Sequence, residues 1–265
     1  MTRASKWFSK NLIKIYAFLG FTYLFIPVIY TFVFSFNNSV KSNLVWRGFT
    51  LNNWKNPCAA PDVCNALGNS LKIGLISTIV ATILGTLIAY ALGRYSFRTR
   101  SATNLLIFLP MATPEIVMGA SLLTMFLSIG VSPGFWTIVI AHVMFCISFV
   151  VVTVKARIAS LDPSLEQAAM DLYANEGETF RKVTLPLLMP GIVSAALLSF
   201  SLSFDDFIIT NFNSGAVNTF PKFVYTSAQR GLPAAANVIG SGMFLVALIV
   251  VLLGQFVGRK RKVLT

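Results

Sequence analysis

Residues 135–154 read Phe-Trp-Thr-Ile-Val-Ile-Ala-His-Val-Met-Phe-Cys-Ile-Ser-Phe-Val-Val-Val-Thr-Val, a run without aspartate, glutamate, lysine or arginine. A helix that crosses a lipid bilayer needs about 20 mostly apolar residues. The run is continuous and does not alternate between apolar and polar positions, so it indicates a helix rather than a barrel strand. We therefore expect residues 135–154 to cross a membrane as one helix.

Five further apolar runs of similar length flank this one, and the whole chain is 55% hydrophobic and only 11% charged. Ordinary globular domains carry roughly a quarter charged residues. The first run is longer than the apolar part of a signal peptide, and we expect it to be retained. The sequence thus predicts an all-α integral membrane protein with six transmembrane helices in a single domain over residues 1–265. The other five predicted spans are 12–36, 70–93, 104–129, 187–212 and 235–257.

The basic residues indicate how these spans are oriented. With six spans, fifteen of the 21 lysines and arginines fall on the side that holds both termini, and six fall on the other side. Cytoplasmic segments carry the excess of lysine and arginine in membrane proteins. Both termini are therefore expected in the cytoplasm. The formal net charge of +12 is mainly a topology signal, and a nucleic-acid partner is not expected.

Cys58 and Cys64 lie in the first predicted outer loop, residues 37–69, with Pro61 and Asp62 between them. A disulfide is permitted outside the cytoplasm, although spacing alone does not establish the geometry that it needs. The sequence therefore leaves this disulfide open. Cys146, in the middle of a predicted span, is expected to be a small buried apolar residue.

The predicted cytoplasmic loop, residues 155–186, has a helical pattern of its own. Pro163 suits the first turn of a helix that Asp162 caps, and an apolar stripe follows at helical spacing. This stripe consists of Leu165, Ala168, Ala169 and Leu172. Such a short amphipathic helix is typical of a docking surface; the alternative is a helix that lies on the membrane interface.

The same loop resembles the EAA loop of ABC importer permeases. That family pattern is matched by Gln167-Ala168-Ala169, by Tyr173 and by Val183-Thr184-Leu185-Pro186. The resemblance implies the MetI-like permease fold with six spans, and a loop that docks on a cytoplasmic ATPase subunit. It assigns ATPase docking to Glu166, Gln167, Ala168, Ala169, Asp171, Leu172, Tyr173 and Pro186.

Two positions depart from the family pattern. Gln167 replaces the family glutamate, although Glu166 is adjacent, and Tyr173 replaces a glycine. That glycine usually turns the chain where positive φ is needed, so Tyr173 must either form another turn or bear strain. The chain has no Gly-x-x-x-x-Gly-Lys-Ser/Thr phosphate loop. We therefore expect a transport subunit rather than an enzyme, with no cofactor of its own and with ATP and magnesium bound by partner ATPase subunits.

Three carboxylates fall inside predicted spans: Glu115, Asp205 and Asp206. An acid near the centre of a spanning helix costs about 2.5–3.5 kcal/mol, and such acids usually face the interior of a helix bundle or an aqueous cavity. Pro110 and Pro114 interrupt the backbone hydrogen bonds just before Glu115. These acids predict a cation pathway. The alternative is that they pair with basic groups of a partner subunit or stay protonated when buried.

His142, the only histidine, lies in the middle of the quoted run. A hydrogen-bonded contact between helices is favoured for it over a role as a proton relay. Metal binding is disfavoured for this residue.

Three segments around these residues resemble the spermidine/putrescine permease subunits, and most closely the second of the two permeases in such systems. They are residues 203–210, 114–118 and 149–154. The resemblance implies a bacterial cytoplasmic-membrane importer with a second permease subunit, two ATPase subunits and an extracytoplasmic binding protein. The alternatives are an ABC permease for thiamine, iron or another cationic solute, or a secondary cation transporter. A membrane-embedded enzyme is disfavoured, because no catalytic constellation occurs in the sequence.

Overall fold

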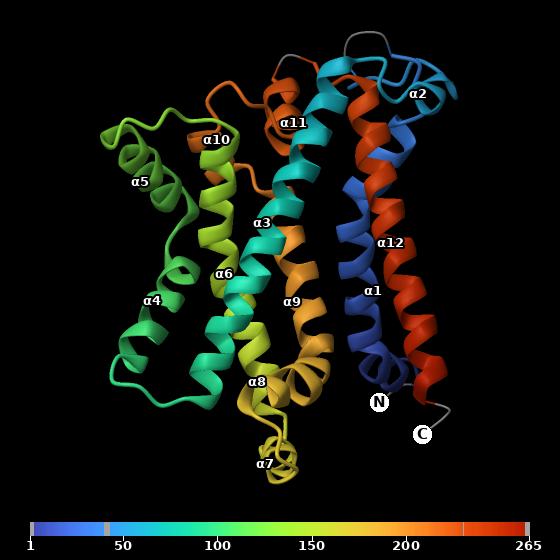
Figure 1. Cartoon of the computed structure of the whole chain (residues 1–265). Helices are drawn as coiled ribbons and strands as arrows, with labels where there is room; N and C mark the ends of the chain where they lie inside the picture. The colour runs from blue at the N-terminus through green and yellow to red at the C-terminus, as the bar shows by residue number, and fades with distance from the viewer. Residues whose placement is uncertain (1–2, 40–42, 230, 263–265) are drawn as a thin grey trace. The chain divides into compact units, whose positions relative to one another are not determined.

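The computed structural model describes residues 3–39, 43–229 and 231–262 (Figure 1). Within these residues the regular secondary structure is helical, and the only β pairing is an isolated bridge between Asn37 and Phe49. The chain divides into two compact units, residues 1–64 with 224–265 and residues 65–223. Each unit is described by itself below.

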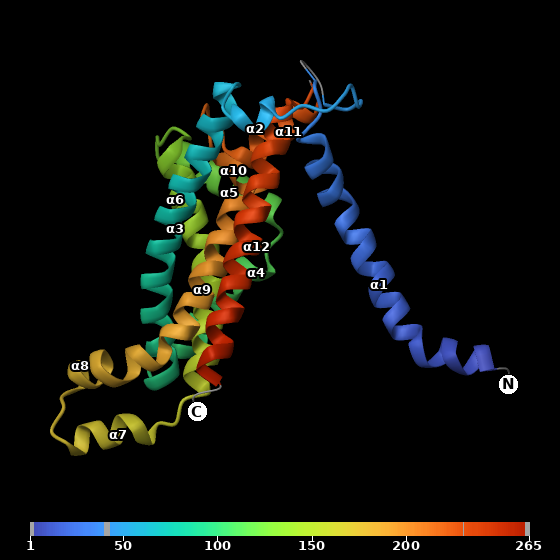
Figure 2. The same ribbon diagram turned by 90° about the vertical axis from the view of Figure 1, so that its right-hand side faces the viewer.

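The first unit contains two long helices, α1 (Arg3–Phe34) and α12 (Ala234–Lys262), and the short helix α2 (Asn52–Lys55). Near the end of α1, a Cβ atom on Gly240 would lie 3.7 Å from Thr31 Cγ2. The rings of Phe25 and Phe244 meet edge to face at 6.5 Å. The two helices therefore pack closely at this end and diverge toward the N-terminus of α1, as Figure 2 shows.

The loop after α1 is held by buried asparagines and by a disulfide. Asn37 Nδ2 donates to Asn43 Oδ1 at 2.6 Å and to the Val45 carbonyl at 2.8 Å. Because buried amides are costly when unpaired, these bonds fix the loop. Cys58 and Cys64 are joined by a disulfide, with their Cα atoms 5.5 Å apart. This disulfide settles the pairing that the sequence left open.

The second unit contains a bundle of long helices. Its elements are most of α3 (Pro61–Arg94), then α4 (Arg100–Ala112), α5 (Glu115–Ser128), α6 (Phe135–Ala159), α7 (Ser164–Asp171), α8 (Glu176–Thr179), the π-helix η1 (Phe180–Thr184), α9 (Leu185–Asp205), α10 (Ile208–Asn213) and the first residues of α11 (Phe220–Ala228). The central helix α6, which contains the whole of the apolar run 135–154, packs against α9, α4 and α10. Its buried core includes Ala141, Val150 and Val154.

Two glycines let α3 approach α6 closely. A Cβ atom on Gly85 would lie 2.6 Å from Val150 Cγ1, and one on Gly93 would lie 2.7 Å from Ile158 Cγ2. These distances are too short for ordinary contacts. Small residues at helix interfaces permit such packing where lipid supplies no hydrophobic driving force between helices.

Five helices are individually long and apolar enough to cross a membrane, and there are six candidate spans if the bent pair α4 and α5 counts as one. The six predicted runs therefore correspond to observed helices. Most helices extend past the predicted ends, since a helix continues into polar sequence beyond the apolar run. The helix α6, for example, ends at Ala159, so the predicted cytoplasmic loop begins inside it.

Two predicted spans are broken helices in the structure, and an interruption was predicted for the first of them only. The run 104–129 is split into α4 and α5, which are bent by 108° (Figure 1). The residue before a proline is disfavoured in helical conformation, and Thr113, before Pro114, is extended with ψ 132°. The run 187–212 is likewise split into α9 and α10, with Asp206 extended between them at ψ 124°.

Candidate functional site

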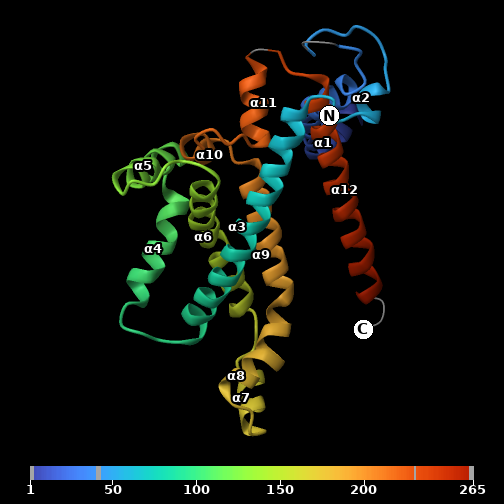
Figure 3. The ribbon, with the colours of Figure 1, turned by 45° about the horizontal axis from the view of Figure 1, so that its top comes forward.

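The predicted acids lie at these two helix breaks. Glu115 is the first residue of α5, and Asp205 is the last residue of α9. The helices α5 and α10 pack side by side, as Figure 3 shows. Asn213 Nδ2 of α10 donates to the Gly119 carbonyl of α5 at 3.2 Å. The two breaks are thus joined through neighbouring helices of one unit.

Asp206 caps the helix that follows it. Its Oδ1 accepts the Thr210 N–H at 2.8 Å, and its Oδ2 accepts the Ile209 N–H at 3.4 Å. Asp206 precedes the N-cap residue Phe207, and its carboxylate oxygens satisfy N–H groups that have no partner within the helix. The carboxylate of Asp206 therefore stabilises the start of α10.

His142 of α6 contacts both sides of the same break. Its Nε2 lies 3.2 Å from Asp206 Oδ1 and 3.0 Å from Thr210 Oγ1, and its Nδ1 lies 2.7 Å from Ser203 Oγ. The side chains of His142 and Asp206 are only 2% and 4% exposed. The prediction that His142 makes a hydrogen-bonded contact between helices is confirmed.

The three acids differ in exposure. Glu115 and Asp205 are exposed, whereas Asp206 is buried. Glu115 lies four residues before Gly119, and Asp205 lies four residues before Ile209; a Cβ atom on Gly119 would lie 3.4 Å from Ile209 Cα. Because α9 ends at Asp205, the two aspartates do not follow one another along a regular helix, in contrast to the continuous span predicted over residues 187–212.

Sequence reasoning missed Ser203 and Thr210 as partners of His142. Both hydroxyls flank the tandem aspartates in the segment 203–210, and that flanking position was the available signal. Among the described residues, no group of three or more histidine, cysteine, aspartate or glutamate side chains is arranged to hold a metal ion.

The predicted docking helix exists as α7, next to α8 (Figure 2). Asp162 Oδ1 accepts the Ser164 N–H at 2.9 Å, as expected of a residue that caps the helix. This hydrogen bond holds the pKa of Asp162 below its ordinary value, because it favours the ionised carboxylate. Asn175 caps α8 in the same way by accepting the Glu178 N–H.

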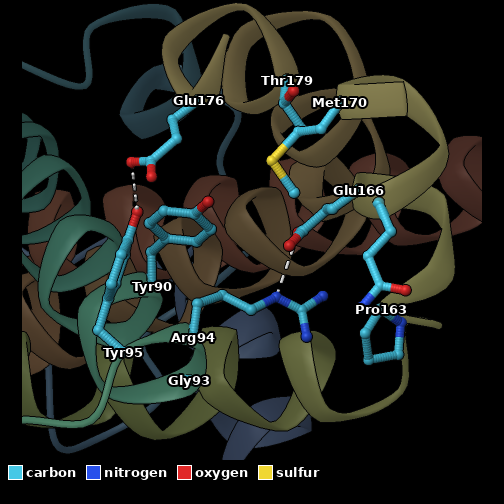
Figure 4. Close-up of a pocket in the computed structure, with 10 residues that line it drawn as sticks. Tyr90, Gly93, Arg94, Tyr95, Pro163, Glu166, Met170, Glu176 and Thr179 are labelled. Carbon is cyan, nitrogen blue, oxygen red and sulfur yellow. Dashed lines mark hydrogen bonds and ion pairs between the residues drawn. The ribbon is translucent and has the colours of Figure 1, made fainter. Parts of the chain in front are cut away.

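The side chain of Glu166 points from α7 toward the end of α3 and η1. Its Oε1 lies 3.1 Å from Arg94 Nε and accepts the Thr184 hydroxyl at 2.9 Å. Figure 4 shows this ion pair across a groove of roughly 400 Å³ between the end of α3 and helices α7 and α8. On the other wall, the Tyr95 hydroxyl donates to Glu176 at 3.3 Å. Glu166 thus ties α7 to the ends of α3 and η1.

The other predicted docking residues are mostly uncovered. Leu172 is 81% exposed and Tyr173 is 98% exposed. Ala169 is partly buried, and the rest of the set is exposed: Gln167, Ala168, Asp171 and Pro186. Leu172 and Tyr173 directly follow the end of α7, and the docking of an ATPase at these residues stays a prediction.

Tyr173 takes the conformation that glycine usually takes. Its φ is 64°, the only positive value at a non-glycine position among the described residues. The Tyr173 N–H donates to Met170 at 2.9 Å, and the Ala174 N–H donates to Ala169 at 3.2 Å. This pair of bonds is the Schellman motif, which ends a helix through a left-handed residue. The turn expected of the family glycine is thus retained, with a strained tyrosine.

A protein-family model supports the resemblance to ABC importer permeases. Residues 66–260 match the model described as "Binding-protein-dependent transport system inner membrane component". The spermidine/putrescine transport system permease protein PotC of Haemophilus influenzae is 36% identical over 257 residues, 97% of this chain and 98% of that protein. The putrescine transport system permease protein PotI of Escherichia coli is 37% identical over 232 residues, 84% of this chain and 82% of that protein.

Solved structures agree on the fold. A bacterial ABC transporter involved in alginate import matches with a TM-score of 0.66 at 16% identity, over 98% of each chain. The MetNI methionine ABC transporter matches with a TM-score of 0.59 at 18% identity, over 75% of this chain and 93% of that one. The fold is therefore the MetI-like fold, and the protein is a membrane transport component rather than an enzyme. On this evidence the chain belongs to the family of inner-membrane permease components of binding-protein-dependent ABC transport systems.

Proposed function

We propose that this chain is one permease subunit of an ATP-driven importer of polyamines, with spermidine and putrescine as substrates. The observation that carries the proposal is the 36% identity with a spermidine/putrescine permease over nearly the whole chain. A second support is chemical. Polyamines carry several ammonium groups, and the chain holds carboxylates at the two helix breaks of one unit.

The acids have different parts in this proposal. Glu115 and Asp205 are the exposed carboxylates that meet the ammonium groups, and Asp206 adds negative charge behind them while it caps α10. A transport pathway must bind its substrate weakly enough to release it. Two exposed acids on separate elements suit that requirement better than a closed cage.

ATP hydrolysis takes place on partner chains in this proposal. One ATPase subunit docks on the exposed face of α7, and Glu166 transmits its movement to α3 through Arg94. A second permease subunit, a second ATPase subunit and an extracytoplasmic binding protein complete the assembly. The chain lies in the bacterial cytoplasmic membrane with both termini in the cytoplasm.

The test is ATP-driven uptake of radiolabelled spermidine and putrescine into proteoliposomes that contain the complete transporter and its binding protein. Asp205→Asn and Glu115→Gln are each expected to lower the maximal rate about tenfold, equivalent to about 1.4 kcal/mol. The half-saturating concentration should stay unchanged because the binding protein sets it. Asp62→Asn, which removes an acid from the first turn of α3, is the matched control and should transport normally.

Uptake by the wild-type transporter tests the substrate assignment. Absence of polyamine uptake, together with ATPase stimulation by a different cation, would show that the substrate assignment is wrong while the family assignment stands.

A further inference from the structure

We infer that His142 is a positioning residue, which fixes the break between α9 and α10 and so sets the position of the exposed Asp205. This inference rests on the proposed function only for the statement that Asp205 meets the substrate. The geometry of the break itself does not depend on which substrate is carried.

His142 is the one side chain among the described residues that bonds the end of α9, the break and α10 together. Ser203 lies in the last turn of α9, Asp206 lies in the break, and Thr210 lies in α10. All three lie within 3.2 Å of a ring nitrogen of His142. The imidazole is rigid, so its two nitrogens set the separation of the two helix ends.

The hydrogen-bonding capacities of these groups fit one arrangement. An ionised carboxylate only accepts hydrogen bonds, so Nε2 carries the proton that faces Asp206. In the neutral imidazole, Nδ1 then accepts the hydroxyl proton of Ser203. His142 is 1% exposed, and without it the buried Asp206 carboxylate would lose a partner that water cannot replace.

The position of Asp205 follows from this network. Asp206 is turned inward by His142 and by the two N–H groups that it caps, and its extended backbone ends α9 one residue earlier. Asp205 is therefore the final residue of α9, where its side chain is exposed. Four residues further on, Ile209 packs against Gly119 of α5, which lies four residues after Glu115. No proline or glycine lies between Asp205 and Ile208 to fix the break, so side-chain bonds do so.

The first experiment measures uptake against ATP hydrolysis in proteoliposomes. His142→Leu removes both ring nitrogens and is expected to lower uptake per ATP hydrolysed about tenfold. His142→Gln places an amide near the position of Nε2 and is expected to recover most of the loss. The matched control is Cys146→Ala, one turn further along α6, since Cys146 contacts α9 at Ser199 and does not reach the break.

The second experiment reads the position of Asp205 without any substrate. In a Cys146→Ala background, Asp205→Cys and Glu115→Cys are combined and treated with a flexible reagent that cross-links two thiols. Cys58 and Cys64 form a disulfide and do not react. We expect efficient cross-linking with His142 present and a yield about tenfold lower with His142→Leu.

An unchanged cross-linking yield in His142→Leu would overturn the inference, even if uptake fell. Equal loss of uptake in His142→Gln and His142→Leu would also overturn it. If His142→Leu does not assemble, Ser203→Ala and Thr210→Val replace it, because each removes one bond on one side of the break. A transporter that moves no polyamine, yet shows the expected change in cross-linking, would refute the proposed function and leave the positioning role intact.

Discussion

Tyr173 keeps the left-handed turn after α7 at a position where the family pattern has glycine. A left-handed conformation costs an L-residue with a Cβ atom about 1–2 kcal/mol, and Tyr173 has φ 64°. The cost is borne because the two Schellman hydrogen bonds end α7 at this point. The ring is 98% exposed, so no packing within the described chain explains why a tyrosine is present.

Two substitutions at Tyr173 distinguish the effect of its backbone conformation from the effect of its aromatic ring. Tyr173→Gly should relieve strain and slow amide hydrogen exchange in α7 about fivefold, equivalent to about 1 kcal/mol. Tyr173→Ala keeps the Cβ atom at positive φ and should not slow exchange. Equal exchange in the two variants would show that the conformation is not strained. If both lose ATPase coupling equally, the ring itself contacts the partner.

At the scale of elements, the two helix breaks have different origins. The sequence predicted an interruption at Pro110 and Pro114, and Thr113, the residue before Pro114, is extended. The break after Asp205 had no such signal, because its cause is a set of bonds to His142, which is 61 residues from Ser203. Local sequence therefore predicted the first interruption and missed the second, since a tertiary contact cannot be read from residues near the break.

Pro114 and Pro110 give a matched pair for testing the first break. Pro110 lies inside α4 without ending it, whereas Pro114 directly precedes α5. Spin labels at Leu105 and Leu127, both exposed, would be about 33 Å apart along a straight helix at 1.5 Å per residue, and closer with the bend. Pro114→Ala should shift the measured distances toward this value and lower uptake, and Pro110→Ala should change neither. A distance unaffected by Pro114→Ala would assign the bend to packing of α5 against α10.

At the scale of the whole molecule, the apolar runs could be predicted from the sequence, since bilayer thickness alone fixes their length. The contacts between residues far apart in the sequence could not be predicted, because such tertiary contacts leave no local pattern. Glu166 with Arg94 joins residues 72 positions apart, and no local pattern signals such a pair. The predicted docking set therefore included Glu166 as an outward residue, although its carboxylate faces its own unit.

Two independent observations favour one orientation of the whole chain in the membrane. Fifteen of the 21 basic residues fall on the side of the termini, which indicates the cytoplasm. The disulfide between Cys58 and Cys64 requires an oxidising compartment for the loop on the other side.

Alkaline phosphatase, which needs an oxidising compartment to fold, should be active when fused after Ala216 and inactive when fused after Ala174. A fluorescent protein at the C-terminus should fluoresce. The reverse pattern in these fusions would contradict the orientation and would place α7 where no ATPase can reach it.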